Sequence, residues 1–354
     1  MSRRSTKLLK AALAAFHYSG ADSFLTPLTR GAGVIFMLHE VRPDPKQDFE
    51  PNHILRVRPD FLEDVITTIA GAGFDVISLD EVGPRLRSPT ARPFACFTLD
   101  DGYRDNRDFA YPIFKRHNVP FTIYVPADFA DGKGDFWWLT LERVLRSARH
   151  ITLAMNGEGK FFPLNSVREK EAAYHEIYWW LRSIPEDLAR AAVAELARAE
   201  GIDPHAPGTE LVMGWDELRD LAQDPLVTIG AHTTTHLALG KLSETEARAE
   251  MADSIARIES ELGRPCRHFS YPYGCEVSAG PREFRIAKEL GLSTAVTTRK
   301  GLLYPEHADA LTALPRLSLN GDFQDIRYVK ALLSGVPFAL MNAVRRVSAP
   351  LKAA

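Results

Sequence analysis

Short apolar segments recur along the chain and alternate with segments of helical periodicity. Eight of them have the length and the largely apolar character of buried strands. They are Val34–Leu38, Phe74–Ser78, Phe94–Leu99, Phe121–Val125, Val227–Ala231, His268–Tyr271, Ser293–Thr298 and Leu314–Leu319. Strands that alternate with helices pair in parallel through right-handed crossovers. The pattern therefore predicts an α/β fold, a distorted (β/α) barrel of seven or eight strands.

Residues 130–210 are too long for a simple connection and carry a pattern of their own. Apolar positions predict one helix around Trp137 to Leu145, and two more over Glu169–Trp180 and Pro185–Glu200. We therefore expect a mainly helical insertion that separates two parts of the barrel. The expected units are a helical extension (1–30), the first barrel part (31–129), the insertion (130–210), the second barrel part (211–322) and a helical tail (323–354).

Two adjacent carboxylates follow the third strand candidate. Asp100 and Asp101 come directly after Phe94–Leu99, and Gly102 follows them. The carboxyl end of a strand is where α/β barrels place their chemistry, and two neighbouring carboxylates are costly to bury unless a cation or a proton offsets their charge. A strand-ending turn is the plain alternative, because Asp-Gly is common in turns.

Two further segments with chemically reactive or polar residues lie at the carboxyl ends of predicted strands. His232 and His236 follow Val227–Ala231, and histidines four residues apart can bind one metal ion. The segment His268–Gly274 must leave the sheet at Pro272, so its backbone N–H groups could face a developing oxyanion. Taken alone, the first spacing is a weak signal and the second segment is more typical of an aromatic turn.

In this order, Asp-Asp-Gly, His-x-x-x-His and Tyr-Pro-Tyr-Gly resemble the motifs of the polysaccharide deacetylase family, the NodB-homology domains of carbohydrate esterase family 4. The resemblance implies hydrolysis of acetyl groups on sugars, usually N-acetylglucosamine units, with a divalent metal ion, generally Zn²⁺ or in its place Co²⁺. It covers residues 31–130 and 211–320.

The resemblance also assigns roles to individual residues. Asp101, His232 and His236 match the metal ligands, Asp100 matches the catalytic base, and the backbone N–H of Tyr273 matches the oxyanion donor. Three protein ligands and an open position are what catalytic zinc requires. Bound zinc would activate a water and polarise the acetyl carbonyl.

The general acid departs from the usual pattern, in which a Leu-x-His motif follows the last strand. Here no histidine follows Leu314–Leu319, but His39 ends the first strand candidate. This order resembles the circularly permuted branch of the family, and the first and last strands of a closed barrel are neighbours. We therefore assign His39 as the acid; a strand-end histidine bonded to backbone is the alternative.

A second departure is Ser270, where much of the family has an arginine that orients the base. Arg316 lies within an otherwise apolar strand candidate and could supply the guanidinium from there. A salt bridge at the barrel rim explains this charge equally well.

Aromatic residues near these motifs are candidates for contact with the sugar. Tyr103 follows Asp-Asp-Gly, Tyr271 lies in the third motif, and Trp137 and Trp138 open the insertion. Packing of the insertion on the barrel accounts for the two tryptophans as well.

Net charge and cysteine count limit the expected binding partners and cellular compartment of the protein. The net charge of −3 gives no reason to expect nucleic-acid binding, and an odd count of three cysteines indicates reduced thiols and a cytoplasmic protein. Basic and apolar residues near both ends, such as Arg3 to Phe16 and Tyr328 to Lys352, could lie on the inner face of a membrane, or pack under the barrel. A lipid-linked glycan would fit the first arrangement.

The sequence thus predicts a metal-dependent deacetylase that acts on an N-acetylated oligo- or polysaccharide. Two alternatives stay open at this point. One is hydrolysis of sugar O-acetyl esters or of non-sugar amides at the same metal centre, and the other is glycan binding without catalysis.

Overall fold

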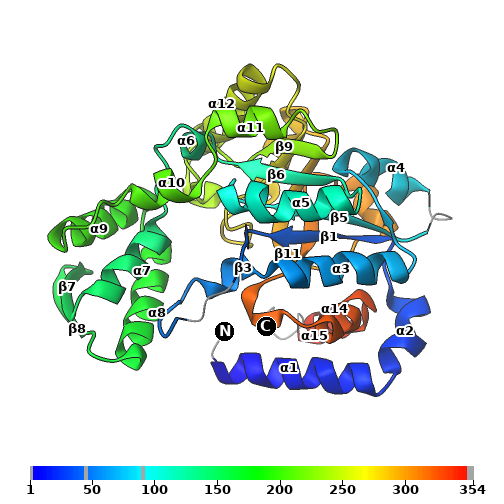
Figure 1. Ribbon diagram of the computed structural model, residues 1–354, viewed down its shortest axis with the longest axis horizontal. Helices are drawn as coiled ribbons and strands as arrows, with labels where there is room; N and C mark the ends of the chain where they lie inside the picture. Colours follow the sequence, from blue (N-terminus) through cyan, green and yellow to red (C-terminus); the bar gives the residue numbers. More distant parts are fainter. Residues whose placement is uncertain (1–2, 44–46, 89–91, 349–354) are drawn as a thin grey trace.

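Seven parallel strands close into a barrel, as the alternation of strands and helices predicts (Figure 1). The computed structural model describes residues 3–43, 47–88 and 92–348. Pairing of the first barrel strand with both its neighbours closes the ring, and a short eighth strand, β4 (Asp75–Val76), is added beside β5. In spatial order the barrel strands are β1 (Gly33–Leu38), β12 (Leu314–Ser318), β11 (Thr294–Lys300), β10 (His268–Ser270), β9 (Val227–Ala231), β6 (Phe121–Val125) and β5 (Phe94–Leu99).

The barrel strands are covered on the outside by helices. Strands β1 and β5 are buried along their whole length, which is why their apolar residues form nearly continuous runs and do not alternate with polar ones. Helix α3 buries its apolar stripe in the same main core; that stripe is Phe61, Leu62, Val65, Ile66 and Ile69. The helices around the barrel are α3 (Pro59–Gly71), α4 (Val82–Arg87), α5 (Tyr111–Arg116), α11 (Trp215–Leu221), α12 (Glu244–Leu262) and α13 (Pro281–Glu289).

The insertion forms a lobe beside one end of the barrel, drawn in green at the left of Figure 1. The three predicted helices are present, as α7 (Trp137–Ser147), α8 (Val167–Ser183) and α9 (Glu186–Ala199), and α10 (Ala206–Leu211) follows them. They share a second apolar core.

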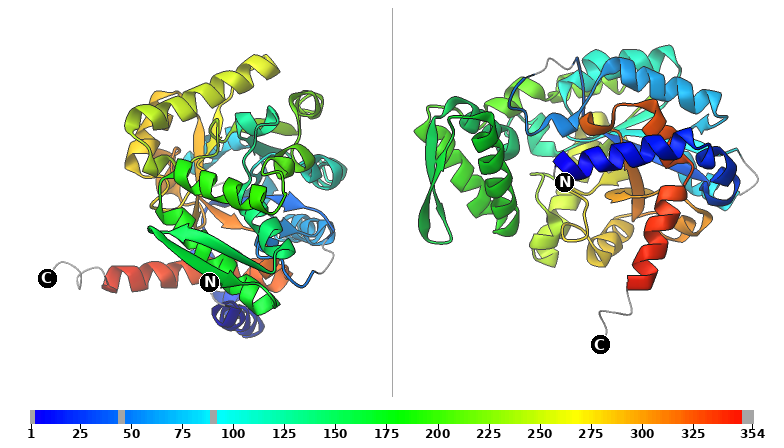
Figure 2. Two further views of the ribbon diagram at one scale, coloured as in Figure 1. Left: turned by 90° about the vertical axis from the view of Figure 1, so that its left-hand side faces the viewer. Right: turned by 90° about the horizontal axis from the view of Figure 1, so that it is seen from below.

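The insertion also contains an antiparallel hairpin that was not among the predicted elements, β7 (His150–Met155) with β8 (Glu158–Pro163), which faces the viewer in the left view of Figure 2. Exposed and buried residues alternate along β7, and Asn156-Gly157 forms the turn with positive φ at both positions. That dipeptide between alternating segments is a strong hairpin signal.

Four helices form the two ends of the described chain. They are α1 (Arg3–Tyr18), α2 (Ala21–Thr29), α14 (Ile326–Leu333) and α15 (Val336–Ser348). Helix α1 lies along α14, beneath the barrel, and buries Leu13 (Figures 1 and 2). Packing therefore accounts for one face of α1, while Leu8 and Leu9 remain exposed.

Membrane contact by these ends stays a prediction. None of the described helices combines the length and the hydropathy that crossing a bilayer would require. The end of the predicted tail, including Lys352, lies outside the described residues.

Candidate active site

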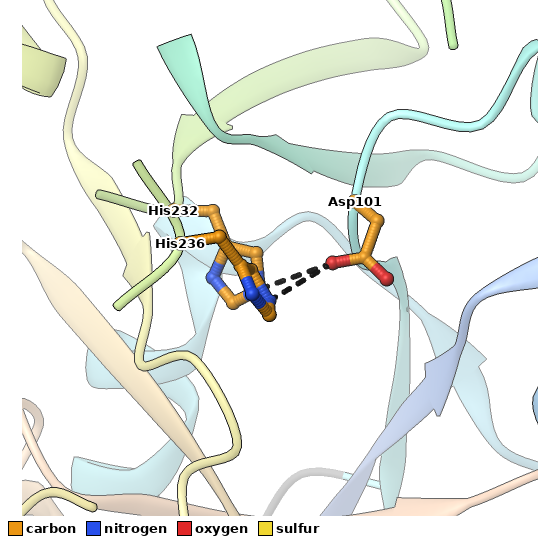
Figure 3. Close-up of side chains that lie close together, drawn as sticks. All are labelled: Asp101, His232 and His236. Carbon is orange, nitrogen blue, oxygen red and sulfur yellow. Dashed lines mark ion pairs between the residues drawn. The ribbon is translucent and has the colours of Figure 1, made fainter. Parts of the chain in front are cut away.

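Asp101, His232 and His236 meet at the carboxyl ends of β5 and β9, as the motifs predict (Figure 3). The Oδ1 atom of Asp101 lies 3.5 Å from Nε2 of His232 and 3.3 Å from Nε2 of His236. All three side chains are buried. Asp101 and His236 have φ values of 73° and 62°, in the left-handed region that non-glycine residues seldom adopt. Such backbone strain is typical of functional sites.

The donor set fits a divalent metal ion. Within the described chain, the buried Oδ1 of Asp101 accepts no hydrogen bond, so a cation would give it a partner. Nδ1 of His232 must donate its proton to the carbonyl oxygen of Ser270, 2.6 Å away, because that oxygen can only accept. This leaves Nε2 of His232 with a free lone pair directed at Asp101. One carboxylate and two imidazoles are ligands that zinc and its neighbours among the transition metals accept.

The electrostatics of the cluster also favour a bound cation. Burial lowers the pKa of His236 below its usual range, although Asp101 opposes this shift, so the imidazole is neutral as a metal ligand must be. Burial by itself would raise the pKa of Asp101, but the close imidazoles of His232 and His236 outweigh it and hold the pKa well below the usual range. Asp101 is therefore ionised.

Asp100 is held in a bidentate ion pair by Arg316, a contact that the sequence analysis proposed between β5 and β12. The two guanidinium nitrogens lie 2.8 and 2.6 Å from its carboxylate oxygens. Arg316 is only 1% exposed, and it also donates to Oγ of Ser270 at 3.0 Å. Burial would raise the pKa of Asp100, but the charge of Arg316 outweighs it and lowers that pKa. The small side chain of Ser270 leaves room for the guanidinium.

His39 directly follows β1, and its imidazole lies near the carboxylate of Asp100. Its Nε2 lies 4.0 Å from Oδ2 of Asp100, and its side chain is 20% exposed. The side-chain amide of Asn106 donates to the backbone carbonyl of His39 at 2.7 Å and to Asp105 at 2.9 Å. These bonds fix the backbone from which the imidazole projects.

Tyr273 completes the site from the loop after β10. Its φ is 60°, and its ring packs edge-on against His236 at 5.1 Å between centroids. Its hydroxyl accepts a hydrogen bond from the indole of Trp137, and its carbonyl accepts one from Thr298. In the described chain its backbone N–H has no hydrogen-bond partner. That N–H is therefore free to donate to a ligand.

One cavity of about 840 Å³ collects these residues. His39, Asp100, Asp101, His232, His236 and Tyr273 line it, together with Trp138 from α7. The other described residues of its wall come from the segment 47–55, from α8 and from β11, which contributes Thr298. The site therefore lies between the barrel and the insertion.

Three of the four residues expected to contact sugar lie elsewhere, which corrects the prediction. Tyr103 and Tyr271 are buried, at 1% and 0% exposure, and neither lines the cavity. Tyr271 packs in the barrel core and donates its hydroxyl proton to the carbonyl of Thr312. Trp137 is also buried, and its indole is bonded to the hydroxyl of Tyr273. Of the four residues expected to contact sugar, Trp138 is therefore the one that lines the cavity.

The cavity wall includes residues that the sequence analysis did not single out. Helix α8 contributes Tyr174, His175, Tyr178 and Trp179. These positions are spaced as i, i+1, i+4 and i+5, which brings them to one helix face. The same spacing is typical of a packed helix, so the pattern alone could not separate a cavity wall from a core.

Comparison with known proteins agrees with this geometry. The family model described as polysaccharide deacetylase matches residues 165–295, a range that includes both histidines and begins after the two aspartates. A search among curated proteins found no match.

Several solved structures share the fold. The deacetylase PplD of Streptococcus pyogenes, solved with acetate, is 17% identical with a TM-score of 0.56, over 85% of this chain and 96% of that one. IcaB from Ammonifex degensii is 17% identical with a TM-score of 0.54, over 86% and 97%. A de-N-acetylase from Aggregatibacter actinomycetemcomitans is 15% identical with a TM-score of 0.52, over 84% and 99%. At such identities the likeness shows the fold, and it leaves the circular permutation a prediction. The family-model match over residues 165–295, the shared fold and the ordered motifs are what this chain has in common with polysaccharide deacetylases.

Proposed function

We propose that the protein is a metal-dependent hydrolase that removes N-acetyl groups from an amino-sugar oligo- or polysaccharide. The observation that carries the proposal is the buried cluster of Asp101, His232 and His236 beside the paired carboxylate of Asp100, all in one cavity. A purely structural site has no need of a strained, buried carboxylate whose Oδ1 lacks a hydrogen-bond donor.

The three clustered residues would hold the metal ion, which we propose to be Zn²⁺. When bound, such an ion supplies Lewis-acid polarisation of the acetyl carbonyl and lowers the pKa of a coordinated water. The hydrogen bond from His232 to the Ser270 carbonyl fixes the tautomer that leaves Nε2 available.

The residues around the cluster divide the proton transfers between them. Asp100, kept ionised by Arg316, accepts a proton from the attacking water as its oxygen bonds to the acetyl carbon. The N–H of Tyr273 donates to the oxyanion that forms on the carbonyl oxygen. His39 then gives a proton to the sugar nitrogen as the carbon–nitrogen bond breaks, which releases acetate and a free amine.

Acetate release provides the test. We would compare wild type and Asp100→Asn on N-acetylglucosamine oligomers and on O-acetylated glycans, after chelation and restoration with zinc or cobalt. Asp220→Asn, the same change at an exposed site on α11, is the matched control. We expect metal-dependent release from wild type and the control, and a loss of about 10²-fold or more in Asp100→Asn.

The substrate panel separates the alternatives. Faster release from O-acetylated glycans than from N-acetylated ones would identify a sugar esterase instead. Metal binding without release from any member, with retained affinity for the oligomers, would support a glycan-binding protein and would contradict the proposal.

A further inference from the structure

Helix α8 presents two different faces along its length. Ala173, Ile177 and Leu181 are buried in the core of the insertion. The opposite stripe faces the cavity, and there Trp179 is 58% exposed. An indole left in water forfeits the free energy of burial, about 25 cal/mol for each Å² of apolar surface. Packing of the insertion therefore does not explain this side chain.

The aromatic rings of this wall form a continuous series that begins at the metal cluster. The Tyr273 ring contacts His236, and its hydroxyl is bonded to Trp137. Trp137 packs on Tyr178 with 5.2 Å between centroids, and Tyr178 packs on Trp179 with 5.3 Å. The exposed indole is thus separated from His236 by several rings of this series, and it lines the same cavity.

The wall is held rigidly against the barrel side of the cavity. The hydroxyl of Tyr174 donates to Oδ1 of Asn52 at 2.7 Å. The side-chain amide of Asn52 donates in turn to the carbonyl of Trp138 and to Glu142. These bonds fix α8 relative to the segment 47–55, which lines the same cavity. A preorganised surface loses little entropy when a ligand binds.

The cavity has room and chemistry for more than one sugar unit. Its volume of about 840 Å³ is near the upper end of the range for cavities that enclose a drug-sized ligand, and a monosaccharide is smaller than that. Asp48 and Glu171 also line it, and the described lining residues include no lysine or arginine. The lining therefore favours an uncharged or amine-bearing sugar over an anionic one.

We propose that the α8 face of His175, Tyr178 and Trp179 is a distal subsite on which a second sugar ring of the same glycan stacks. The apolar C–H face of a pyranose packs on the indole while the acetyl group of another unit occupies the metal site. The subsite gives the protein a preference for oligosaccharides over the monosaccharide. This inference rests on the proposed function for the identity of the glycan.

The kinetic test is the ratio of kcat/KM for the N-acetylglucosamine trimer or pentamer to that for the monosaccharide. Wild type should prefer the oligomers, and Trp179→Ala should lower the ratio about three- to tenfold, the effect of losing one aromatic contact. Trp179→Phe should retain most of it. Trp180→Ala is the matched control, because Trp180 does not line the cavity and donates instead to Asn156 of the hairpin. The control should keep the wild-type ratio.

Two results would overturn the subsite: a wild-type ratio near one, or an equal fall of kcat/KM on all chain lengths in Trp179→Ala. Calorimetric binding of the same oligomers to the zinc-loaded protein keeps the test independent of catalysis. If wild type released no acetate, the proposed function would fail, while weaker oligomer binding by Trp179→Ala would still support the subsite. Equal binding by both proteins would refute it.

Discussion

Replacement of Arg316 by methionine tests the charge balance of the site most directly. The buried guanidinium makes five hydrogen bonds, two of them to Asp100 and the others to Thr297, Thr98 and Ser270. Methionine keeps much of the volume but leaves the buried carboxylate without its cation. Removal of one partner from a buried ion pair costs about 3–5 kcal/mol. We expect the free energy of unfolding to fall by about that amount.

A double-mutant cycle separates the ion pair from the loss of packing. In Asp100→Asn with Arg316→Met, neither charge remains buried, so the double variant should lose less stability than the sum of the two single variants. Coupling of about 1–3 kcal/mol is usual for such contacts. Urea unfolding of the metal-free protein, followed by tryptophan fluorescence, measures it. Additive effects within error would refute the reasoning.

The same variants bear on catalysis. Arg316→Lys keeps a positive charge but cannot hold both carboxylate oxygens as the guanidinium does. We expect kcat/KM to fall about tenfold in Arg316→Lys, because the Asp100 carboxylate is no longer held in one orientation. In Arg316→Met we expect a fall of about 10²-fold or more, because Asp100 also loses the positive charge that keeps it ionised. Wild-type activity in Arg316→Met would show that the pair serves structure alone.

Three further predictions concern the metal, a buried acid and a close contact. Zinc at about 100 times its Kd should stabilise the fold by about 2.7 kcal/mol, and His236→Ala should remove most of that shift in thermal unfolding. Burial, reinforced by Glu40, raises the pKa of Asp105 to about 7. Because the unfolded carboxyl titrates near pH 4, the ionised group costs stability progressively as the pH rises from about 4 to 7. Asp105→Asn should therefore raise the free energy of unfolding at pH 8 by up to about 4 kcal/mol, with a higher Tm, and leave both unchanged at pH 4. Equal shifts of Tm at both pH values would show that the ionised carboxylate is not the cause. Gly230→Ala places a Cβ atom 2.6 Å from the Tyr124 ring and should cost about 1–3 kcal/mol, whereas Gly71→Ala, with open space around it, should be neutral or slightly stabilising in the same assay.

Apart from Arg316, which lies within β12, the site residues that could be predicted from the sequence share one property: each lies in a local motif at the end of an apolar strand. Asp101 and His236 follow β5 and β9, which both pair with β6, so the ends of these strands lie near one another. The barrel could be predicted from the apolar strand segments themselves, because strands buried on both faces are largely apolar along their length.

The parts that could not be predicted depend on which face of an element meets solvent. Tyr103 and Tyr271 follow or precede site residues in the chain, yet they point into cores. Trp179 has the spacing of a core residue and lines the cavity instead. Only tertiary packing decides between these environments, because helical or strand periodicity is the same in both.

The position of the arginine that pairs with Asp100 can itself be tested by exchange. Ser270 stands where the family pattern has an arginine, and its Oγ lies 3.0 Å from the guanidinium of Arg316. Ser270→Arg alone would bury a second guanidinium against the first, and we expect a loss of several kcal/mol from overpacking and like charge. Adding Arg316→Ser should recover most of that stability and part of the activity, because one guanidinium again faces Asp100. Thermal unfolding and acetate release measure both; a double variant less stable than Ser270→Arg would mean that β12, not the pocket around Asp100, dictates where the arginine must lie.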